Sequence, residues 1–251
     1  MLKGGIFLDM ENLVRCGGWG MRYSAVKDLV SAQGVRVLRA NAYMAIDRLR
    51  ESGDPEYRRK KEGYRTAIRG AGFHLVLKEV KRYRDSEGEL YMKANADLDL
   101  AVDVLLQSEN LDYVLLGSGD GDFLRLVRAI QSRGKRIDLI SFSNTSTELR
   151  GEVDYYFSGY LVPGVLPSPG DKVRMRGIMH YVNEEKGYGF LTVRTGYGVT
   201  DVRDDVFCHI TKVSLNGRDL TNEEFAQLKT RDAVLEFDMV HQDDGKLMAT
   251  N

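Results

Sequence analysis

The stretch Tyr113–Phe123, with the sequence YVLLGSGDGDF, is a short apolar run followed by a loop of serine, glycine and aspartate. An apolar run of this length, bounded by turn residues, predicts a strand that is buried on both faces. A second such run, Gly5–Asp9 (GIFLD), also ends in an acid. Strands of this kind that alternate with helices predict a parallel sheet covered on both faces, in which ligands bind beyond the carboxyl ends of the strands.

The same alternation continues to about residue 160, so the fold class we expect is α/β. The remaining predicted helices lie at Ser24–Ala32, Pro55–Arg69, Asp97–Gln107 and Phe123–Ser132, and the remaining strands at Val35–Tyr43, Phe73–Glu79 and Ile137–Phe142.

Three of the four prolines, Pro163, Pro167 and Pro169, fall in one short segment. Because proline disfavours both helix and central strand, this segment predicts a linker at 163–171 between domains at 1–162 and 172–251. The second domain has five short strand patterns and one helix near Asn222–Leu228, which indicates a small β-barrel. Its strands are expected at Val173–Val182, Gly189–Val193, Val206–Ile210, Ala233–Asp238 and Lys246–Thr250.

The composition narrows the class of protein. The chain has 251 residues, of which 43% are hydrophobic, enough for the cores of one or two domains. Its 36 Lys and Arg residues balance 37 Asp and Glu residues, so a case for nucleic-acid binding must rest on local arrangement. Two distant cysteines exclude a disulfide framework and a structural zinc site, and no apolar run is long enough to span a membrane. We therefore expect a soluble, cytoplasmic protein without a membrane partner.

Acids gather where the predicted strands end. Asp9 ends the first strand, Asp120 and Asp122 follow Tyr113–Leu116, and Asp97 begins a helix. Neighbouring carboxylates repel one another unless a cation neutralises them, and oxygen ligands without clustered His or Cys favour Mg²⁺ or Mn²⁺. Such an ion activates water and stabilises charge on a phosphate, which points to phosphodiester hydrolysis.

Simpler roles compete with this interpretation. Asp120 and Asp122 are also suited to cap the helix that begins near Phe123. In the helix Asp97–Gln107, a helical wheel places Asp97 beside the apolar side and Asp103 on the solvated side. The residues that the wheel predicts to be buried are Leu98, Ala101, Val102 and Leu105.

The segments FLDMEN, DLDLAVDVL and LLGSGDGDF together resemble the NYN domain, a branch of the PIN-like nuclease superfamily, over about residues 3–160. The resemblance implies metal-dependent cleavage of RNA, with Asp9, Asp97, Asp120 and Asp122 as metal ligands. It further implies that Asn12 orients a ligand or the substrate. Weaker candidates for the same site are Asp103, Ser118, Asn144 and Asp154.

Two features of the first domain have both a binding and a structural interpretation. A basic stretch suited to attract phosphates includes Arg58, Arg59, Lys60 and Lys61, although a solvated helix face has the same composition. Trp19, in a glycine-rich loop after the first strand, either stacks on substrate or packs over the sheet, and we favour packing.

The segments KGYGF and VFCH in the second domain resemble the two aromatic motifs of the cold-shock domain, an OB-fold barrel that binds single-stranded nucleic acid. Tyr181 stands where that family usually has Trp. Strand alternation places Phe190 and Phe207 on faces opposite to Leu191 and Cys208, and exposed aromatic side chains on a barrel typically stack on bases. A role in packing or protein contact is the alternative. The predicted RNA-binding residues are Tyr181, Lys186, Tyr188, Phe190, Phe207 and His209.

The sequence therefore predicts a metal-dependent ribonuclease acting on single-stranded RNA, with Mg²⁺ or Mn²⁺ as cofactor and a barrel that binds the RNA. A non-catalytic RNA-binding regulator and a pure interaction protein are the alternatives. The sequence does not decide between RNA and DNA as the ligand. It also leaves the oligomeric state open, with a homodimer as one alternative.

Overall fold

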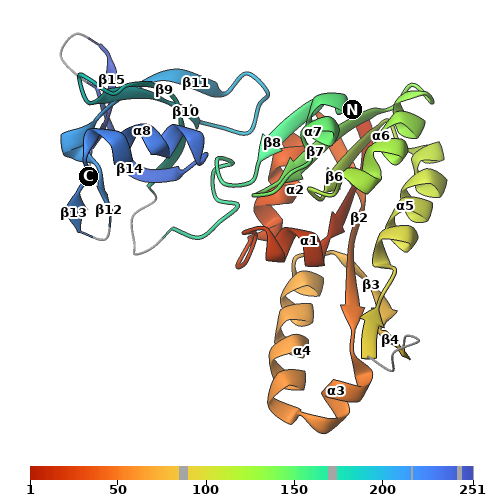
Figure 1. Ribbon diagram of the computed structural model, residues 1–251. Helices are drawn as coiled ribbons and strands as arrows, with labels where there is room; N and C mark the ends of the chain where they lie inside the picture. The colour runs from red at the N-terminus through yellow and green to blue at the C-terminus, as the bar shows by residue number, and fades with distance from the viewer. Residues whose placement is uncertain (85–89, 169–173, 216, 242–244, 251) are drawn as a thin grey trace. The chain divides into compact units, whose positions relative to one another are not determined.

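The computed structural model describes residues 1–84, 90–168, 174–215, 217–241 and 245–250. The chain divides into two compact units, Met1–Gly159 (unit 1) and Tyr160–Asn251 (unit 2). Figure 1 shows a sheet with helices in unit 1 and a barrel in unit 2. Of the predicted linker, residues 169–171 lie outside the described residues, and the part that precedes them forms turns.

Unit 1 contains a six-stranded sheet in the order β3-β2-β1-β6-β7-β8, in which every neighbouring pair is parallel. The predicted parallel sheet is thus confirmed. The strands are β1 (Leu2–Asp9), β2 (Val35–Ile46), β3 (His74–Glu79), β6 (Tyr113–Gly117), β7 (Arg136–Ser141) and β8 (Tyr155–Ser158).

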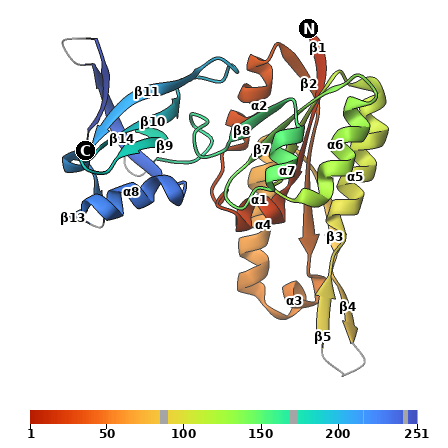
Figure 2. The same cartoon turned by 45° about the horizontal axis from the view of Figure 1, so that its top comes forward.

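Helices cover both faces of this sheet. Side chains of β1 point alternately to opposite faces. Phe7 packs with the buried residues of α5 and α6, whereas Ile6 and Leu8 are buried on the other face, where Figures 1 and 2 show α2. The α-helices of unit 1 are α1 (Met10–Arg15), α2 (Tyr23–Ala32), α3 (Arg48–Gly53), α4 (Pro55–Gly70), α5 (Ala96–Gln107), α6 (Leu124–Gln131) and α7 (Thr147–Glu152).

Shorter elements complete unit 1. The strands β4 (Lys81–Arg84) and β5 (Leu90–Lys93) pair as an antiparallel hairpin. Single 3-10 turns occur at η1 (Ser108–Asn110) and η2 (Gly121–Phe123), and η2 stands where the sequence predicts the start of the α6 helix.

The buried face of α5 differs from the prediction. Ala96, Leu100 and Val104 are buried, whereas Leu98 is 59% exposed and Val102 is 45% exposed. The helix carries apolar residues of its own on almost every side, so a helical wheel does not single out one buried face. The sheet decides the orientation, because Leu100 and Val104 are the residues that pack with Phe7.

Unit 2 is a closed mixed barrel of five strands in the order β10-β11-β15-β14-β9. The β11–β15 pair is parallel and the other pairs are antiparallel. This is an OB-like barrel, which confirms the fold expected for the second domain. The strands are β9 (Met175–Asn183), β10 (Tyr188–Arg194), β11 (Val202–His209), β14 (Val234–His241) and β15 (Leu247–Thr250).

The helix α8 (Asn222–Thr230) closes the barrel core. Its side chain Phe225 is fully buried among residues of the strands, including Leu191 and Phe237. The predicted capping box is present, since Thr221 and Glu224 exchange side-chain and backbone hydrogen bonds. The short strands β12 (Ser214–Leu215) and β13 (Arg218–Asp219) precede the helix, and the 3-10 turn η3 (Ile210–Lys212) follows β11.

In the part of the chain that the structure describes, no helix combines the length and apolar character needed for a membrane crossing.

The observed face of α5 predicts a difference between two leucine substitutions. Leu100→Ala should lower the free energy of unfolding by about 2–5 kcal/mol, because it leaves a cavity beneath the sheet. Leu98→Ala, at an exposed position of the same helix, should change it by less than about 0.5 kcal/mol. Urea unfolding followed by the fluorescence of Trp19, the single tryptophan, measures both in unit 1. Equal losses would contradict the observed orientation of α5.

Candidate functional site

A hydrogen-bond network joins the ends of β1 and β6 at the carboxyl edge of the sheet. The buried carboxylate of Asp9 accepts from the backbone N–H of Asn12 at 3.1 Å and from Oγ of Ser118 at 3.1 Å. The side-chain oxygen of Asn12 accepts from the backbone N–H of Gly119 at 2.8 Å. Ser118 Oγ also accepts from the backbone N–H of Asp120 at 3.2 Å. The network fixes the two chain segments that carry Asp9 and Asp120.

Strand alternation explains why these groups meet. Leu8 pairs with Gly117 across the β1–β6 ladder, so Asp9 and Ser118 follow at the same level. Asp9 also has the parity of Phe7, which faces α5. The first turn of α5 carries Asp97, which therefore comes close to Asp9.

The environment of Asp9 disfavours its charged form. The surroundings together raise the pKa of Asp9 to about 6. Burial is the largest cause, and repulsion from Asp97 and Glu11 adds to it, whereas the hydrogen bonds from Asn12 and Ser118 oppose it. A cation close to a buried carboxylate with negative neighbours favours its charged form.

Asp97 belongs to the same electrostatic cluster. The residue as a whole is exposed, but its carboxyl group is partly buried. This partial burial is the largest cause of its raised pKa, and repulsion from Asp120, Glu11 and Asp122 raises the pKa further. Arg15 lowers this pKa as the weakest of these influences. The four predicted metal ligands are thus brought into one region of mutual repulsion.

Glu11 is a member of the cluster that sequence reasoning missed. It raises the pKa of both Asp9 and Asp97, and its Oε1 accepts from the backbone N–H of Ala45 at 3.1 Å. Its position in DMEN, two residues beyond the end of the first strand, was the available signal.

Asp120 and Asp122 also show the capping role weighed as an alternative. The side chain of Asp120 accepts from the backbone N–H of Asp122 at 3.0 Å and caps η2. Asp9 caps α1 in the same way through Asn12. Capping and ligand binding are compatible here, since the two oxygens of a carboxylate together have about four lone-pair sites.

The acids do not converge as a preformed metal cage. Among the described residues, no group of three His, Cys, Asp or Glu side chains is placed to hold a metal ion together. The cluster is therefore defined by its electrostatics and its shared edge of the sheet.

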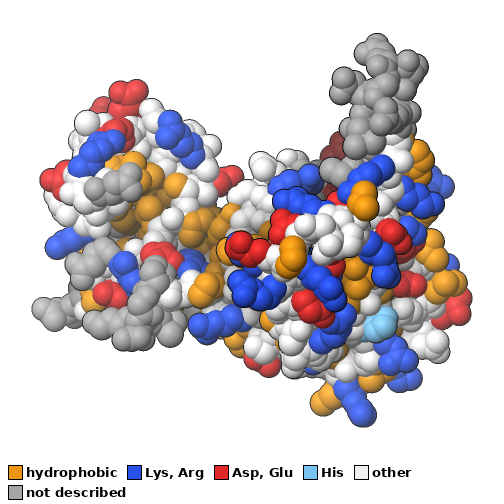
Figure 3. All heavy atoms as spheres, turned by 90° about the horizontal axis from the view of Figure 1, so that it is seen from below, with side chains coloured by type: hydrophobic (Ala, Val, Ile, Leu, Met, Phe, Trp, Pro, Cys, Tyr) orange, Lys and Arg blue, Asp and Glu red, His pale blue; other side chains and the backbone are white. Residues whose placement is uncertain are grey.

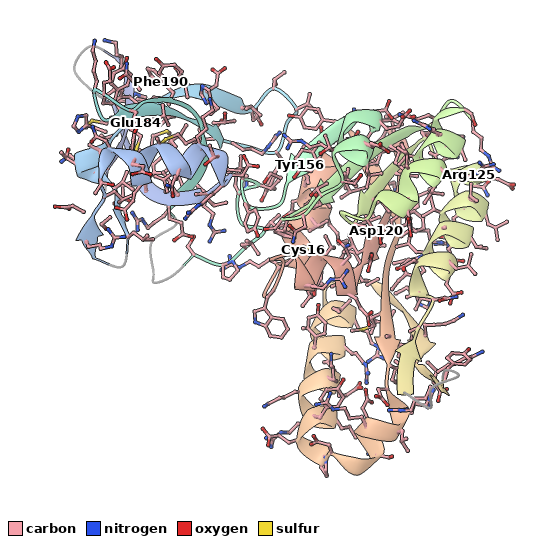
Figure 4. All side chains as sticks on the ribbon, viewed as in Figure 1. Cys16, Asp120, Arg125, Tyr156, Glu184 and Phe190 are labelled. Atoms are coloured by element: carbon pink, nitrogen blue, oxygen red, sulfur yellow. The ribbon has the colours of Figure 1, made fainter. Side chains whose placement is uncertain are left out.

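A polar cavity of about 630 Å³ adjoins this cluster. Asn12, Asp120 and Arg15 line it together with hydroxyl-bearing residues of the loop after β7. Figure 4 shows Asp120 and Cys16 at the same end of the unit 1 sheet. Asn144, one of the weaker candidates, lines the cavity and has a left-handed backbone with φ of 56°. The remaining lining residues are Gly119, Gly121, Thr145, Ser146 and Thr147.

Two of the weaker candidates have structural partners away from the cavity. The carboxylate of Asp103 accepts from the hydroxyl of Tyr43 at 2.8 Å, so it is not on a merely solvated face. Asp154 accepts from the backbone N–H of Ile137 at 2.7 Å, at the amino end of β7. Because the other acids lie at the carboxyl ends, Asp154 is at the opposite edge of the sheet.

The basic stretch carries a mixed charge. Lys60 pairs with Glu56 at 2.9 Å, and Lys61 lies 5.5 Å from the centre of the Tyr57 ring. Figure 3 shows Lys and Arg side chains alternating with Asp and Glu side chains over unit 1. The four predicted phosphate contacts, all on α4, are Arg58, Arg59, Lys60 and Lys61.

In unit 2, the predicted aromatic residues form one connected surface. The ring centres are 6.0 Å apart for Phe190 and Phe207, 5.7 Å for Tyr188 and Phe207, and 6.0 Å for Tyr181 and Phe190. The ring of His209 stacks on Phe207 at 6.4 Å. Register explains the cluster, because Phe190 pairs with Phe207 on β11 and with Tyr181 on β9.

This aromatic surface faces outward. Phe190 and Phe207 alternate with Leu191 and Cys208, which are buried in the barrel core, and Tyr181 is 43% exposed. Figure 4 labels Phe190 on the barrel. Lys186, in the turn between β9 and β10, is exposed.

The raised pKa of Asp9 predicts how stability depends on pH without metal. Since folding raises this pKa from 3.8 to about 6, the unfolded chain releases the proton more readily, and the free energy of unfolding falls as pH rises. The fall that Asp9 causes should be about 2 kcal/mol between pH 4.5 and 7.5. Asp9→Asn removes this titration, so its stability relative to wild type should rise with pH in urea unfolding with EDTA.

Asp28→Asn, at an exposed position of α2, is the matched control and should follow wild type at both pH values. An Asp9→Asn effect of the same size at pH 4.5 and 7.5 would contradict the electrostatic account.

Comparison with known proteins places unit 1 in a family. Residues 3–161 match the NYN domain. The chain is 32% identical over 106 residues to the Low amplitude and bright protein LabA of Synechococcus elongatus, across 41% of this chain and 55% of that protein. It therefore spans about half the length of this curated relative.

Among solved structures, the chain is similar to a protein of unknown function from Vibrio parahaemolyticus. The sequence identity is 26% and the TM-score is 0.49, with 62% of this chain and 91% of that chain covered. The family match extends over more than half of the sequence. The chain therefore belongs to the NYN domain family, within the PIN-like nuclease superfamily, whose members generally use divalent metals.

Proposed function

We propose that this protein is a divalent-metal-dependent ribonuclease that hydrolyses phosphodiester bonds of single-stranded RNA. The observation that carries the proposal is the buried Asp9 carboxylate with its pKa raised to about 6, beside Asp97 at the carboxyl edge of an NYN sheet. Burying carboxylates beside one another costs folding stability. Carboxylates with strongly shifted pKa values are therefore found preferentially where a function requires them.

The donor set fits Mg²⁺ or Mn²⁺. The side chains that repel one another here are all carboxylates, and these hard oxygen donors suit such ions. Mg²⁺ in particular keeps several waters and binds through one or two carboxylates together with substrate phosphates. When bound, the ion would supply a water of lowered pKa and charge stabilisation at the phosphate. Asp9, Asp97, Asp120 and Asp122 are the residues that would hold it.

The chain's own residues prepare the site for an anionic substrate. Asn12 and Ser118 fix Asp9 and the loop that carries Asp120. Arg15 lines the adjoining polar cavity and is the cation among the influences on the pKa of Asp97. The cavity offers a phosphate a positive charge and hydroxyl donors beside the acids.

The barrel supplies binding by stacking. Its segment from 170 to 251 contains 11 basic and 14 acidic residues, a net charge of −3, so counterion release alone does not account for affinity. The connected rings of Phe190, Phe207 and Tyr188 give single-stranded bases a platform. These contacts favour the cold-shock-like role over a purely structural one.

A non-catalytic RNA-binding regulator is the second candidate. The observation in its favour is that Asp9 and Asp120 already act as caps for α1 and η2. In that case the acids would be kept for local structure, and RNA binding would proceed without turnover.

The Asp120→Asn variant separates the two candidates. Asparagine still caps a helix start, so the loop should keep its fold while one metal ligand loses its charge. Cleavage of a labelled single-stranded RNA in Mn²⁺ or Mg²⁺ should fall by about 100-fold or more. RNA affinity should stay within a factor of about 2 of the wild-type value.

Asp28→Asn again serves as the control and should cleave at the wild-type rate, while EDTA should abolish cleavage by the wild type. If the wild type binds the RNA but cuts none in either metal, the nuclease proposal is wrong and the regulator takes its place.

The barrel surface makes a separate prediction about affinity. Combining Phe190→Ala with Phe207→Ala should weaken binding of single-stranded RNA by about 2–6 kcal/mol, at about 1–3 kcal/mol for each stacked base. Val202→Ala, which also truncates an exposed side chain of β11, should bind as the wild type does. Fluorescence anisotropy of labelled RNA in EDTA measures both, and an unchanged affinity of the double variant would reject the platform.

A further inference from the structure

Trp19 is the single tryptophan of the chain, and its side chain is 70% exposed. The predicted packing of this ring over the sheet is therefore wrong. Leaving a large aromatic ring in water forgoes the burial that stabilises most tryptophans. Such exposure is informative when the ring is held in place.

The loop that carries Trp19 is fixed by its backbone. The backbone N–H of Gly18 donates to the carbonyl of Leu13 at 2.8 Å, and that of Met21 donates to the carbonyl of Gly18 at 3.2 Å. Gly17, with φ of 113°, adopts a backbone that favours glycine. A Cβ on Gly18 would lie 2.5 Å from the ring of Phe142, so the loop packs closely there.

This packing also locates Trp19 in the fold. Phe142 directly follows the last residue of β7, at the carboxyl edge of the sheet. The backbone N–H of Ser143 donates to the carbonyl of Cys16 at 2.9 Å, which ties the start of the loop to the same edge. Trp19 therefore projects from the edge of the sheet that carries Asp9 and Asp120.

Tyr64 of α4 supports one face of the indole. The two ring centres are 6.0 Å apart with an interplanar angle of 21°, a stacked arrangement. Tyr64 is itself held by a hydrogen bond between its hydroxyl and that of Tyr23 at 2.9 Å. The indole is thus pre-oriented, and its exposure leaves area for another flat ring.

The charge near Trp19 favours nucleic acid as the ligand. Arg15 and Arg22, four residues before and three residues after it, are both exposed. Neither forms a salt bridge with any residue that the structure describes. An oriented aromatic ring with free guanidinium groups nearby in the chain combines the two elements of single-strand binding, a stacking surface and cations for the backbone.

We propose that Trp19 and Tyr64 form a stacking site for a nucleobase of single-stranded RNA in unit 1, additional to the aromatic surface of the barrel. The indole takes the base on its open face, and Tyr64 holds the indole from behind. The inference rests on the proposed function only for the class of ligand, because base stacking requires neither metal nor cleavage.

The single tryptophan gives a direct test. Titration of the full chain with a single-stranded RNA oligonucleotide in EDTA should quench Trp19 emission saturably, because a base stacked on the indole alters its excited state. Trp19→Ala should lower RNA affinity by about 5- to 150-fold in an anisotropy assay, the equivalent of one stacked base. Circular dichroism should match the wild type, since the ring is mostly exposed.

Three further variants complete the test. Tyr64→Phe keeps the supporting ring and should retain quenching, whereas Tyr64→Ala removes it and should weaken binding. Leu49→Ala truncates a side chain of α3 that is 65% exposed and should leave affinity unchanged.

The outcomes separate this site from the proposed function. RNA binding with unchanged Trp19 emission, and with wild-type affinity in Trp19→Ala, overturns the stacking site and leaves the ribonuclease proposal standing. Quenching by a proline-rich peptide, but not by RNA, overturns it in favour of a peptide groove. If the wild type does not bind RNA at all, both this stacking site and the RNA ligand of the proposed function are rejected.

Discussion

The carboxylate of Asp9 is the point on which the arrangement of unit 1 depends. It receives hydrogen bonds from the start of α1 and from the loop after β6, through Asn12 and Ser118. The same two residues then bind Gly119 and Asp120. One buried side chain therefore connects two segments that are far apart in the sequence, since Asp9 and Ser118 are separated by 109 positions. The sheet places these segments side by side, and the network fixes their loops.

A second buried carboxylate shows what is unusual about Asp9. Asp138, on β7, is fully buried but pairs with Arg136 at 2.7 Å and accepts from the hydroxyl of Tyr113 at 2.9 Å. Asp9 has negative neighbours instead, and within the described residues it has no salt bridge. A buried charge without a cationic partner is strongly destabilising. Under the proposed function, an external cation would take the place of this partner at Asp9.

The sequence was sufficient for the parts of the site that depend on strand ends. The ends of apolar runs locate Asp9 and Asp120, because parallel strands finish at one edge. The helical wheel fails for α5: apolar residues occupy almost every side of this helix, so the sheet selects the buried face, and Leu98 and Val102 are exposed. Asp154, a candidate implied by the family resemblance, precedes β8 and so lies at the amino edge. The orientation of α5 is a tertiary property, which periodicity along one element does not contain.

Under the proposed function, charge and stacking would divide the work of binding an anionic polymer. The acids of unit 1 would repel RNA until a cation is present, and the basic side chains of α4 are partly neutralised, as Lys60 is by Glu56. With a net charge of −1, the chain has no general attraction for phosphates. Rings held by neighbouring rings, such as Phe207 beside Phe190, have little conformational freedom left to lose on binding. In the proposed function, pre-oriented aromatic surfaces would therefore provide affinity that bulk charge does not, and would leave the acidic edge free to hold a cation.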